Sequence, residues 1–255
     1  MKVWTVANQK GGVGKTTTVI TLGAILAQQG KKVLMIDTDP HASLTYYFGL
    51  DSEQLEFGVY DVFTRSDTMD QAYWNKCTWQ SPVPNLDILP ATMAMATLDG
   101  VLSKKSGMGL IIKKALAKFA TEYDHVIIDC PPILGVLMVN ALAACDKVLI
   151  PVQTECMALK GLERMYRTME LIQSSQSKEY DVCIIPTMYD KRTKASKVAY
   201  KELNHMYANK VWQGVIPIDT NFRTASMERT PLPIFNKNSR GVFAYQELLK
   251  QIENN

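Results

Sequence analysis

The sequence has few cysteines and little excess charge of either sign. Its 255 residues include five cysteines, which are scattered and never form a Cys-x-x-Cys pair. A disulfide framework or a zinc site is therefore not expected, and the chain fits a reducing compartment such as the cytoplasm. The 28 basic and 25 acidic residues leave a net charge of +3. That excess is too small to indicate a nucleic-acid partner unless basic residues gather in one patch.

Long apolar runs and low-complexity tracts are also missing. No uncharged apolar stretch approaches the roughly 20 residues that span a bilayer. The first strand candidate leads into a glycine-rich loop rather than a signal-peptide cleavage site. Neither an internal repeat nor a Gly/Ser/Pro-rich linker divides the chain. We therefore expect a soluble, cytoplasmic protein with a single domain over residues 1–255.

Short apolar runs alternate with longer segments of helical periodicity. The strand candidates are 2–7, 32–36, 126–128, 148–152, 182–185 and 211–216, and the helical candidates are 15–29, 109–121, 159–174 and 195–208. The apolar runs lack polar alternation, as strands buried on both faces do. This order predicts an α/β fold with a single doubly wound, mostly parallel sheet and helices on both of its faces. Residues 51–84 are less regular and are expected to form a partly helical insertion.

The strongest motif follows the first predicted strand. It reads Asn8-Gln9-Lys10-Gly11-Gly12-Val13-Gly14-Lys15-Thr16-Thr17. Glycines let the backbone curl so that several N–H groups point at one phosphate, and the following helix adds its positive end. In such a loop Lys15 bridges the β- and γ-phosphates of ATP, and the Thr16 hydroxyl binds Mg²⁺. The predicted nucleotide-binding residues are Lys10, Gly11, Gly12, Val13, Gly14, Lys15, Thr16 and Thr17.

Two acidic strand ends extend this prediction. The second predicted strand is followed by Asp37-Thr38-Asp39-Pro40-His41, and the strand at 126–128 by Asp129-Cys130-Pro131-Pro132. Ligands bind beyond the carboxyl ends of strands in open α/β sheets. We expect Asp39 to orient the attacking water and to touch the magnesium shell, and Asp129, at the Walker B position, to hold Mg²⁺. A turn-forming Asp-Pro pair is the alternative for Asp39.

The loop Lys-Gly-Gly-x-Gly-Lys-Thr-Thr resembles the ParA/MinD family of deviant Walker A ATPases. In that family the first lysine, here Lys10, reaches across a dimer interface to the partner's nucleotide. The resemblance implies slow, Mg²⁺-dependent ATP hydrolysis by an ATP-dependent homodimer, with Lys10, Lys15 and Asp39 as catalytic residues. It also implies a protein partner that stimulates hydrolysis or anchors the protein at the cell pole. Family members carry Asp-x-Asp-Pro-Gln where this chain has His41, so the role of residue 41 stays open.

Resemblance to the family continues in the distal half of the chain. The strand end at Met188 and the loop at Pro217 correspond to family segments that flank adenine, so both residues are expected to contact the base. Ordinary packing at strand ends is the alternative. Spacing by three and four places Lys194, Lys197 and Lys201 on one helix face. Together with Arg223 and Arg240 they form a candidate patch for nonspecific DNA binding, or a merely solvated surface.

Four short segments resemble a narrower branch of the family, called ParC, which places chemotaxis arrays at the cell pole. These segments are 37–44, 106–110, 189–193 and 217–223. The implied function is ATP-driven positioning of chemotaxis arrays, with the protein enriched at the pole or on the nucleoid. A plasmid or chromosome partition ATPase, or a P-loop enzyme with a second small-molecule substrate, are the alternatives. The tail at 239–255 is too short and too acidic for the membrane-binding tail of MinD-type members, so no membrane insertion is expected.

Overall fold

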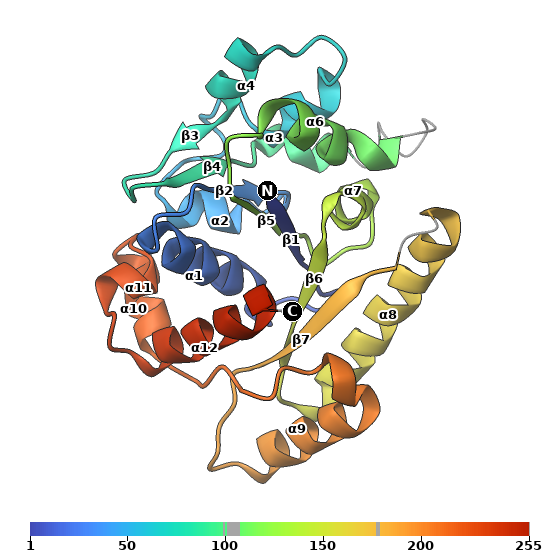
Figure 1. The fold of residues 1–255 in the computed structure, drawn as a ribbon, viewed down its shortest axis with the longest axis vertical. Helices are drawn as coiled ribbons and strands as arrows, with labels where there is room; N and C mark the ends of the chain where they lie inside the picture. Colours follow the sequence, from blue (N-terminus) through green and yellow to red (C-terminus); the bar gives the residue numbers. More distant parts are fainter. Residues whose placement is uncertain (99, 101–107, 177–178, 255) are drawn as a thin grey trace.

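A computed structural model describes residues 1–98, 100, 108–176 and 179–254. Within these residues seven strands form one sheet in the order β3-β4-β2-β5-β1-β6-β7 (Figure 1). The strands are β1 (Lys2–Val6), β2 (Val33–Asp37), β3 (Trp79–Gln80), β4 (Leu86–Leu89), β5 (His125–Asp129), β6 (Lys147–Gln153) and β7 (Asp181–Thr187). Neighbouring strands pair in parallel except β3 and β4, which are antiparallel. The predicted mostly parallel sheet is confirmed.

Helices connect most of the strands. They are α1 (Lys15–Gln28), α2 (Ser43–Tyr47), α3 (Val59–Thr64), α4 (Gln71–Cys77), α6 (Ile111–Phe119), α7 (Val136–Ala144), α8 (Cys156–Gln176), α9 (Lys194–Tyr207), α10 (Asn221–Met227), α11 (Leu232–Phe235) and α12 (Arg240–Asn254). The four helices predicted from periodicity correspond to α1, α6, α8 and α9, with ends that differ by a few residues. Helical spacing of apolar residues in these segments is strong, which is why they could be predicted.

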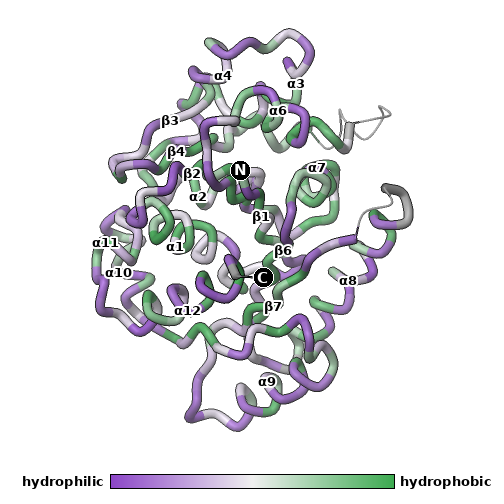
Figure 2. Tube along the Cα trace, in the orientation of Figure 1, coloured by the Kyte–Doolittle hydropathy of each residue, from purple (hydrophilic) through white to green (hydrophobic). Residues whose placement is uncertain are grey.

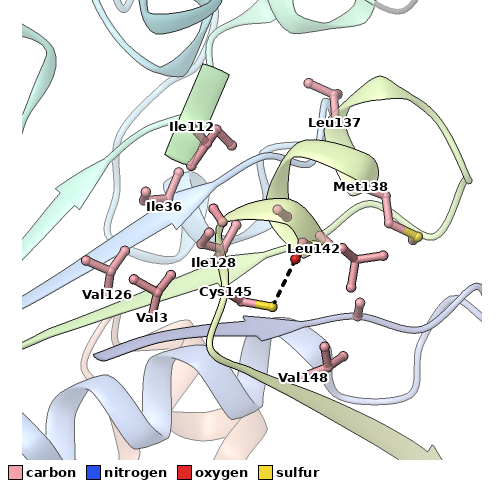
Figure 3. Packing of buried hydrophobic residues seen from close by; sticks show 14 of the residues in the cluster. Val3, Ile36, Ile112, Val126, Ile128, Leu137, Met138, Leu142, Cys145 and Val148 are labelled. Atoms are coloured by element: carbon pink, nitrogen blue, oxygen red, sulfur yellow. Dashed lines mark hydrogen bonds between the residues drawn. The ribbon is translucent and has the colours of Figure 1, made fainter. Parts of the chain in front are cut away.

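Both faces of the sheet are covered, because alternate residues of each strand point to opposite sides. In β2, Val33 and Met35 pack in a cluster with α1 and α12, whereas Leu34 and Ile36 pack on the other face. Figure 3 shows this second face, where side chains from α6 and α7 lie over β1, β2 and β5. Figure 2 shows the same division by hydropathy, with hydrophobic central strands and many hydrophilic residues on α9 and the outer turns. The predicted helices on both faces are confirmed.

The prediction of a strand at 211–216 is wrong. This segment runs beside β7 but makes only isolated bridges, between Val211 and Ile184 and just beyond the segment between Pro217 and Tyr189. Pro186 of β7 has no N–H to donate, so a continuous ladder cannot form there. Gly214 also lies against the buried Trp212 ring, so closely that a Cβ on Gly214 would sit 2.3 Å from it. The chain therefore bends where a strand was expected.

The less regular insertion is helical in part, as expected, since α3 and α4 lie within residues 51–84. The short strands β3 and β4 were not anticipated. β4 pairs in parallel with β2, and its polar residue Asp87 accepts a 2.8 Å hydrogen bond from the Tyr123 hydroxyl. A charged residue within a run of four interrupts the apolar signal of a buried strand, so periodicity did not reveal β4.

The order of the strands reverses at β1. From β1 the chain passes to β2 on one side of the sheet, and from β5 it crosses β1 to reach β6 on the other side. Ligands in open α/β sheets bind at the carboxyl ends of the strands that flank such a reversal. The phosphate loop, residues 8–17, follows β1 at this point. The fold therefore places the strongest sequence motif at the position where a ligand is expected.

Candidate nucleotide-binding site

The phosphate loop has the backbone that an anion cradle requires. Gly12 and Gly14 adopt φ angles of +71° and +92°, which only glycine takes without strain. Among the described residues, no heavy atom lies within 4 Å of where a Cβ would sit on Gly11, Gly12 or Gly14, apart from atoms of the adjoining chain. α1 begins at Lys15, directly after this cradle. The loop thus combines open space with the positive end of a helix dipole.

A cavity of about 520 Å³ opens above the loop. Its volume lies within the range of pockets that hold small molecules and cofactors. The loop, the end of β2 and the distal half of the chain all contribute to its lining, which includes Gly11, Gly12, Gly14, Lys15, Thr16, Thr17, Asp39, His41, Pro132, Met188 and Phe222. Lys10 and Val13 are not part of it. The cavity lining therefore contains most of the predicted phosphate-binding residues and also Asp39.

Beneath the phosphate loop two buried carboxylates lie on neighbouring strands, and one of them contacts the cavity-lining Thr16. Asp37 ends β2 opposite Asp129, which ends β5, and both are buried. The Thr16 hydroxyl donates a 2.6 Å hydrogen bond to Asp129 Oδ2, whereas Asp129 Oδ1 has no hydrogen-bond partner among the described residues. Asp37 accepts hydrogen bonds from the Thr45 hydroxyl and backbone N–H, at 2.7 and 2.9 Å.

Burial of this pair disfavours its negative charge. Burial raises the pKa of Asp37 to about 6. Burial, followed by repulsion from Asp37, raises the pKa of Asp129 well above its ordinary value. Two buried carboxylates at one point are stabilised by a cation. Magnesium in nucleotide sites uses one or two carboxylates together with phosphate oxygens and water. The orphaned Asp129 oxygen and the Thr16 hydroxyl therefore fit a magnesium ion.

Asp37 was missed by the sequence analysis, which assigned function to Asp39 alone on this strand. The signal was present, since β2 reads four apolar residues followed by aspartate, and β5 similarly ends with three apolar residues followed by aspartate. Asp39 lines the cavity with a side chain that is 13% exposed. Its Oδ1 accepts a 2.9 Å hydrogen bond from the backbone N–H of His41 and lies 3.0 Å from the imidazole Nδ1. Asp39 therefore forms a local turn and faces the cavity as well.

Lys15 and Lys10 lie in different surroundings. Lys15 is buried, lines the cavity and donates a 3.2 Å hydrogen bond from Nζ to the Lys10 carbonyl. The Lys10 ammonium forms an ion pair with Glu155, just after the end of β6, and Val13 packs inside the protein with no exposed surface. The Val13 carbonyl accepts a 2.9 Å hydrogen bond from the Thr187 hydroxyl. Among the loop residues predicted to bind nucleotide, Lys10 and Val13 direct their side chains elsewhere.

A second, apolar cavity of about 320 Å³ adjoins the phosphate cavity and shares Gly14, Thr17, Met188 and Phe222 with it. We call it the base slot, because two of its lining residues are those that the sequence analysis expects to contact the base. Its lining also includes Thr187, Ile216, Pro217, Ile218, Arg223 and Tyr245. The two predicted base contacts, Met188 and Pro217, therefore meet in one slot beside the phosphate loop. Phe222, an aromatic residue in the first turn of α10, lines both cavities and was not predicted.

The predicted basic patch is divided among three places. Lys194, Lys197 and Lys201 are exposed on α9. Arg223 lines the base slot instead. Arg240 lines a neighbouring cleft of about 490 Å³ together with Lys191 and Arg192, and this cleft shares Pro217 and Ile218 with the base slot. Only the three lysines form a row on one helix face, as the spacing predicted.

Comparison with known proteins decides the family. A family model described as an AAA domain matches residues 1–186. The chain is 37% identical over 255 residues to the sporulation initiation inhibitor protein Soj of Bacillus subtilis. The aligned region covers 100% of this chain and 99% of that relative. The chain is also 33% identical over 255 residues to the chromosome partitioning protein ParA of Caulobacter vibrioides, covering 99% and 94%. The chain belongs to the ParA/MinD family of P-loop ATPases.

A solved structure extends the likeness of this ParA-family chain to three dimensions. Cobyrinic acid a,c-diamide synthase from Mycobacterium smegmatis, with a bound ATP analogue and magnesium, is 33% identical. It superimposes with a TM-score of 0.83 and covers 99% of this chain and 96% of that one. The likeness to the narrower ParC branch finds no comparable support, and its segment at 106–110 lies partly outside the described residues.

The apolar side of α12, the carboxyl-terminal helix of this ParA-family protein, packs against the protein interior. Tyr245, Leu248, Leu249 and Ile252 of α12 are buried in the cluster that contains α1. The Tyr245 hydroxyl lies 2.8 Å from the Thr18 hydroxyl, next to the phosphate loop. Among the helices described, none combines the length and the apolar character needed to cross a membrane.

Proposed function

We propose that the protein is a partition ATPase that binds Mg·ATP, dimerises on ATP, binds DNA nonspecifically and is reset by slow hydrolysis. The observation that carries this proposal is the hydrogen bond between Thr16, which lines the phosphate cavity, and Asp129, the buried carboxylate at the Walker B position. The names of the relatives in Bacillus subtilis and Caulobacter vibrioides favour partition over the positioning of chemotaxis arrays. We therefore propose chromosome or plasmid DNA, rather than chemotaxis arrays, as the cargo.

Nucleotide binding follows from the two cavities. Backbone N–H groups of the loop and the Lys15 ammonium hold the phosphates, while Met188, Pro217 and Phe222 hold the base. Thr16 and Asp129 would hold magnesium, with Asp37 and Asp39 around it. When bound, magnesium neutralises charge that develops on the transferred phosphoryl group.

We infer that Asp39 orients the attacking water. Asp39 lies two residues beyond the end of β2 and lines the cavity that Thr16 also lines, and the backbone N–H of His41 donates a hydrogen bond to one of its oxygens. Orientation of water without strong activation gives slow turnover, which suits a switch better than a metabolic enzyme. Hydrolysis then changes which surface the protein presents to its partners.

Dimerisation would cover exposed apolar residues that follow Pro132 and Glu155 in the chain. Ile133 and Leu134, which follow the cavity-lining Pro132, are 65% and 46% exposed, and Met157, just after Glu155, is 65% exposed. Exposed apolar side chains of this kind mark interaction surfaces. In the dimer Lys10 would reach the partner's nucleotide. Two copies of the α9 lysine row would then face DNA, and phosphate contacts would double.

The purified full chain tests this proposal directly. We expect it to run as a dimer with Mg·ATP and as a monomer with ADP when sized by light scattering. Random duplex DNA should bind only with ATP, and this binding should weaken steeply as salt rises. DNA binding that is absent at low salt, or independent of ATP, would reject the DNA-based part of the proposal. The enzyme alternative, with a second small-molecule substrate, rests only on the name of the Mycobacterium smegmatis neighbour.

A further inference from the structure

Within a single protomer the Lys10 side chain is held away from the phosphate cavity. Its ammonium pairs with the Glu155 carboxylate and lies 3.5 Å from Gln153 Oε1, both near the end of β6. The stem of Lys10 passes over α8, where a Cβ on Gly161 would lie 3.4 Å from Lys10 Cβ. The cation that distinguishes this phosphate loop is therefore already neutralised inside its own chain.

The backbone at the start of the loop fixes this direction. The Lys10 N–H donates a 3.0 Å hydrogen bond to Asn8 Oδ1, and Asn8 Nδ2 donates a 2.8 Å hydrogen bond to the Pro151 carbonyl of β6. The Gln9 amide donates a 2.6 Å hydrogen bond to the Thr168 hydroxyl of α8. The entrance of the loop is thus attached to β6 and α8, the two elements on either side of Glu155.

We propose that Glu155 is an intramolecular latch for Lys10, which must open before Lys10 can bind a phosphate across the dimer. The inference rests on the proposed ATP-dependent dimer. A carboxylate and a phosphate compete for the same ammonium, so the ion pair opposes assembly until ATP and a second protomer are present. Because Glu155 directly precedes α8, opening of the latch also frees the start of that helix. Dimer assembly would thereby change the surface at the start of α8, which includes the exposed Met157.

The size of the effect follows from the exposure of the pair. The side chains of Lys10 and Glu155 are 29% and 41% exposed, so solvent screens their attraction. Breaking one exposed ion pair of this kind changes an equilibrium constant by about two- to fivefold. A symmetric dimer opens two latches, so the dimer association constant should change by about four- to twenty-five-fold.

Glu155→Gln tests the latch, since it removes the charge and keeps the shape. Association with a non-hydrolysable ATP analogue is measured by analytical ultracentrifugation at low salt and at about 1 M salt, where screening is strong. We expect tighter association in Glu155→Gln at low salt, and a smaller difference from wild type at high salt. Glu163→Gln is the matched control, because Glu163 lies on the exposed side of α8 and pairs with Arg167. Unchanged or weaker association in Glu155→Gln, with wild-type thermal stability, would overturn the latch.

A Lys10→Ala background separates this inference from the proposed function. If Glu155 acts only through Lys10, Glu155→Gln should have no further effect on association in the Lys10→Ala protein. An added effect of similar size in that background would show that Glu155 acts elsewhere and would overturn the latch. Normal ATP-dependent dimerisation of Lys10→Ala itself would instead remove the trans role of Lys10 from the proposed function.

Discussion

The Thr16 hydroxyl donates a 2.6 Å hydrogen bond to Asp129 Oδ2 across 113 residues of sequence. Thr16 lies in the first turn of α1, and Asp129 ends β5 opposite Val6 of β1. Parallel pairing of β1 with β5 therefore brings the end of the Walker B strand to the start of the phosphate loop. Both side chains carry oxygen, the ligand that magnesium prefers. The contact marks the point at which phosphate and metal would meet.

Lys15→Ala should weaken Mg·ATP binding by at least about 10- to 100-fold, because a charge-assisted hydrogen bond to phosphate is lost. Lys15 lines the cavity, and its ammonium donates to the Lys10 carbonyl of the same loop, so the fold should persist. Isothermal titration calorimetry measures the affinity. Lys32→Ala, an exposed lysine before β2 that pairs with Glu122, is the control and should bind normally. Wild-type affinity in Lys15→Ala would remove Lys15 from the phosphate site.

Asp39→Ala should retain ATP and slow hydrolysis by about two to four powers of ten, because the group that orients water is lost. The dimer should accumulate, since phosphate contacts survive and reset does not occur. Phosphate release and light scattering give the two readouts. Asp67→Ala, at an exposed position of the insertion, serves as the control. Turnover at the wild-type rate would leave Asp39 with its turn-forming role alone.

Asp129→Asn should stabilise the protein in EDTA while weakening Mg²⁺-dependent nucleotide binding. It removes one charge from the buried pair with Asp37, and relief of about 1 kcal/mol would raise Tm by about 2–4 °C. The pKa of Asp37 is raised to about 6 in the folded protein, from 3.8. Its protonated form therefore favours folding, and this contribution is lost as pH rises through about 6. The gain in Tm should accordingly be small at pH 4 and larger above about pH 6, as the two carboxylates of the wild-type pair ionise.

Melting curves in EDTA across this pH range measure the effect, and Asp67→Asn controls for the loss of one carboxylate. A lower Tm in Asp129→Asn at every pH would mean that the Thr16 contact outweighs the repulsion. Equal nucleotide affinity with and without Mg²⁺ in the wild-type protein would argue against the magnesium site itself.

Phe222→Ala should weaken ATP and ADP binding alike, by about 2- to 10-fold, because the contact is with the base that both nucleotides share. Phe222 also packs on Tyr245, with ring centroids 6.0 Å apart, so the melting temperature must be followed in parallel. Phe243→Ala is the control, since Phe243 lies on α12 and is 54% exposed. A loss of ATP affinity alone would place Phe222 nearer the γ-phosphate than the base.

Replacement of Lys194, Lys197 and Lys201 by alanine should weaken ATP-dependent DNA binding for every duplex sequence. Each lost phosphate contact should lower the slope of log affinity against log salt by about 0.9. Filter binding over a salt series measures that slope. Lys113, Lys114 and Lys118 are basic residues on α6, and their replacement by alanine controls for net charge. Equal losses in both triple variants would indicate a general charge effect rather than a site on α9.

The sequence was sufficient where neighbouring residues act together. Apolar runs and helical periodicity predicted the parallel sheet, its helices on both faces and the phosphate loop, because each depends on residues close in the chain. Prediction from the sequence failed where a strand depends on its pairing partner or on a backbone N–H donor of the neighbouring strand. Pro186 cannot donate to a ladder, so residues 211–216 do not form the expected strand. Asp87 obscures β4, which is held in place by β2.

Within the site, the sequence by itself determined the glycine cradle, Lys15, Thr16 and Asp129, since a curled backbone needs glycine and a strand end needs its own carboxylate. Tertiary structure alone decided three further features. Register between β2 and β5 sets Asp37 against Asp129, and the fold brings Phe222 to both cavities. It also directs Lys10 to Glu155, 145 residues away. Such contacts depend on how distant strands and helices pack, which no local pattern encodes.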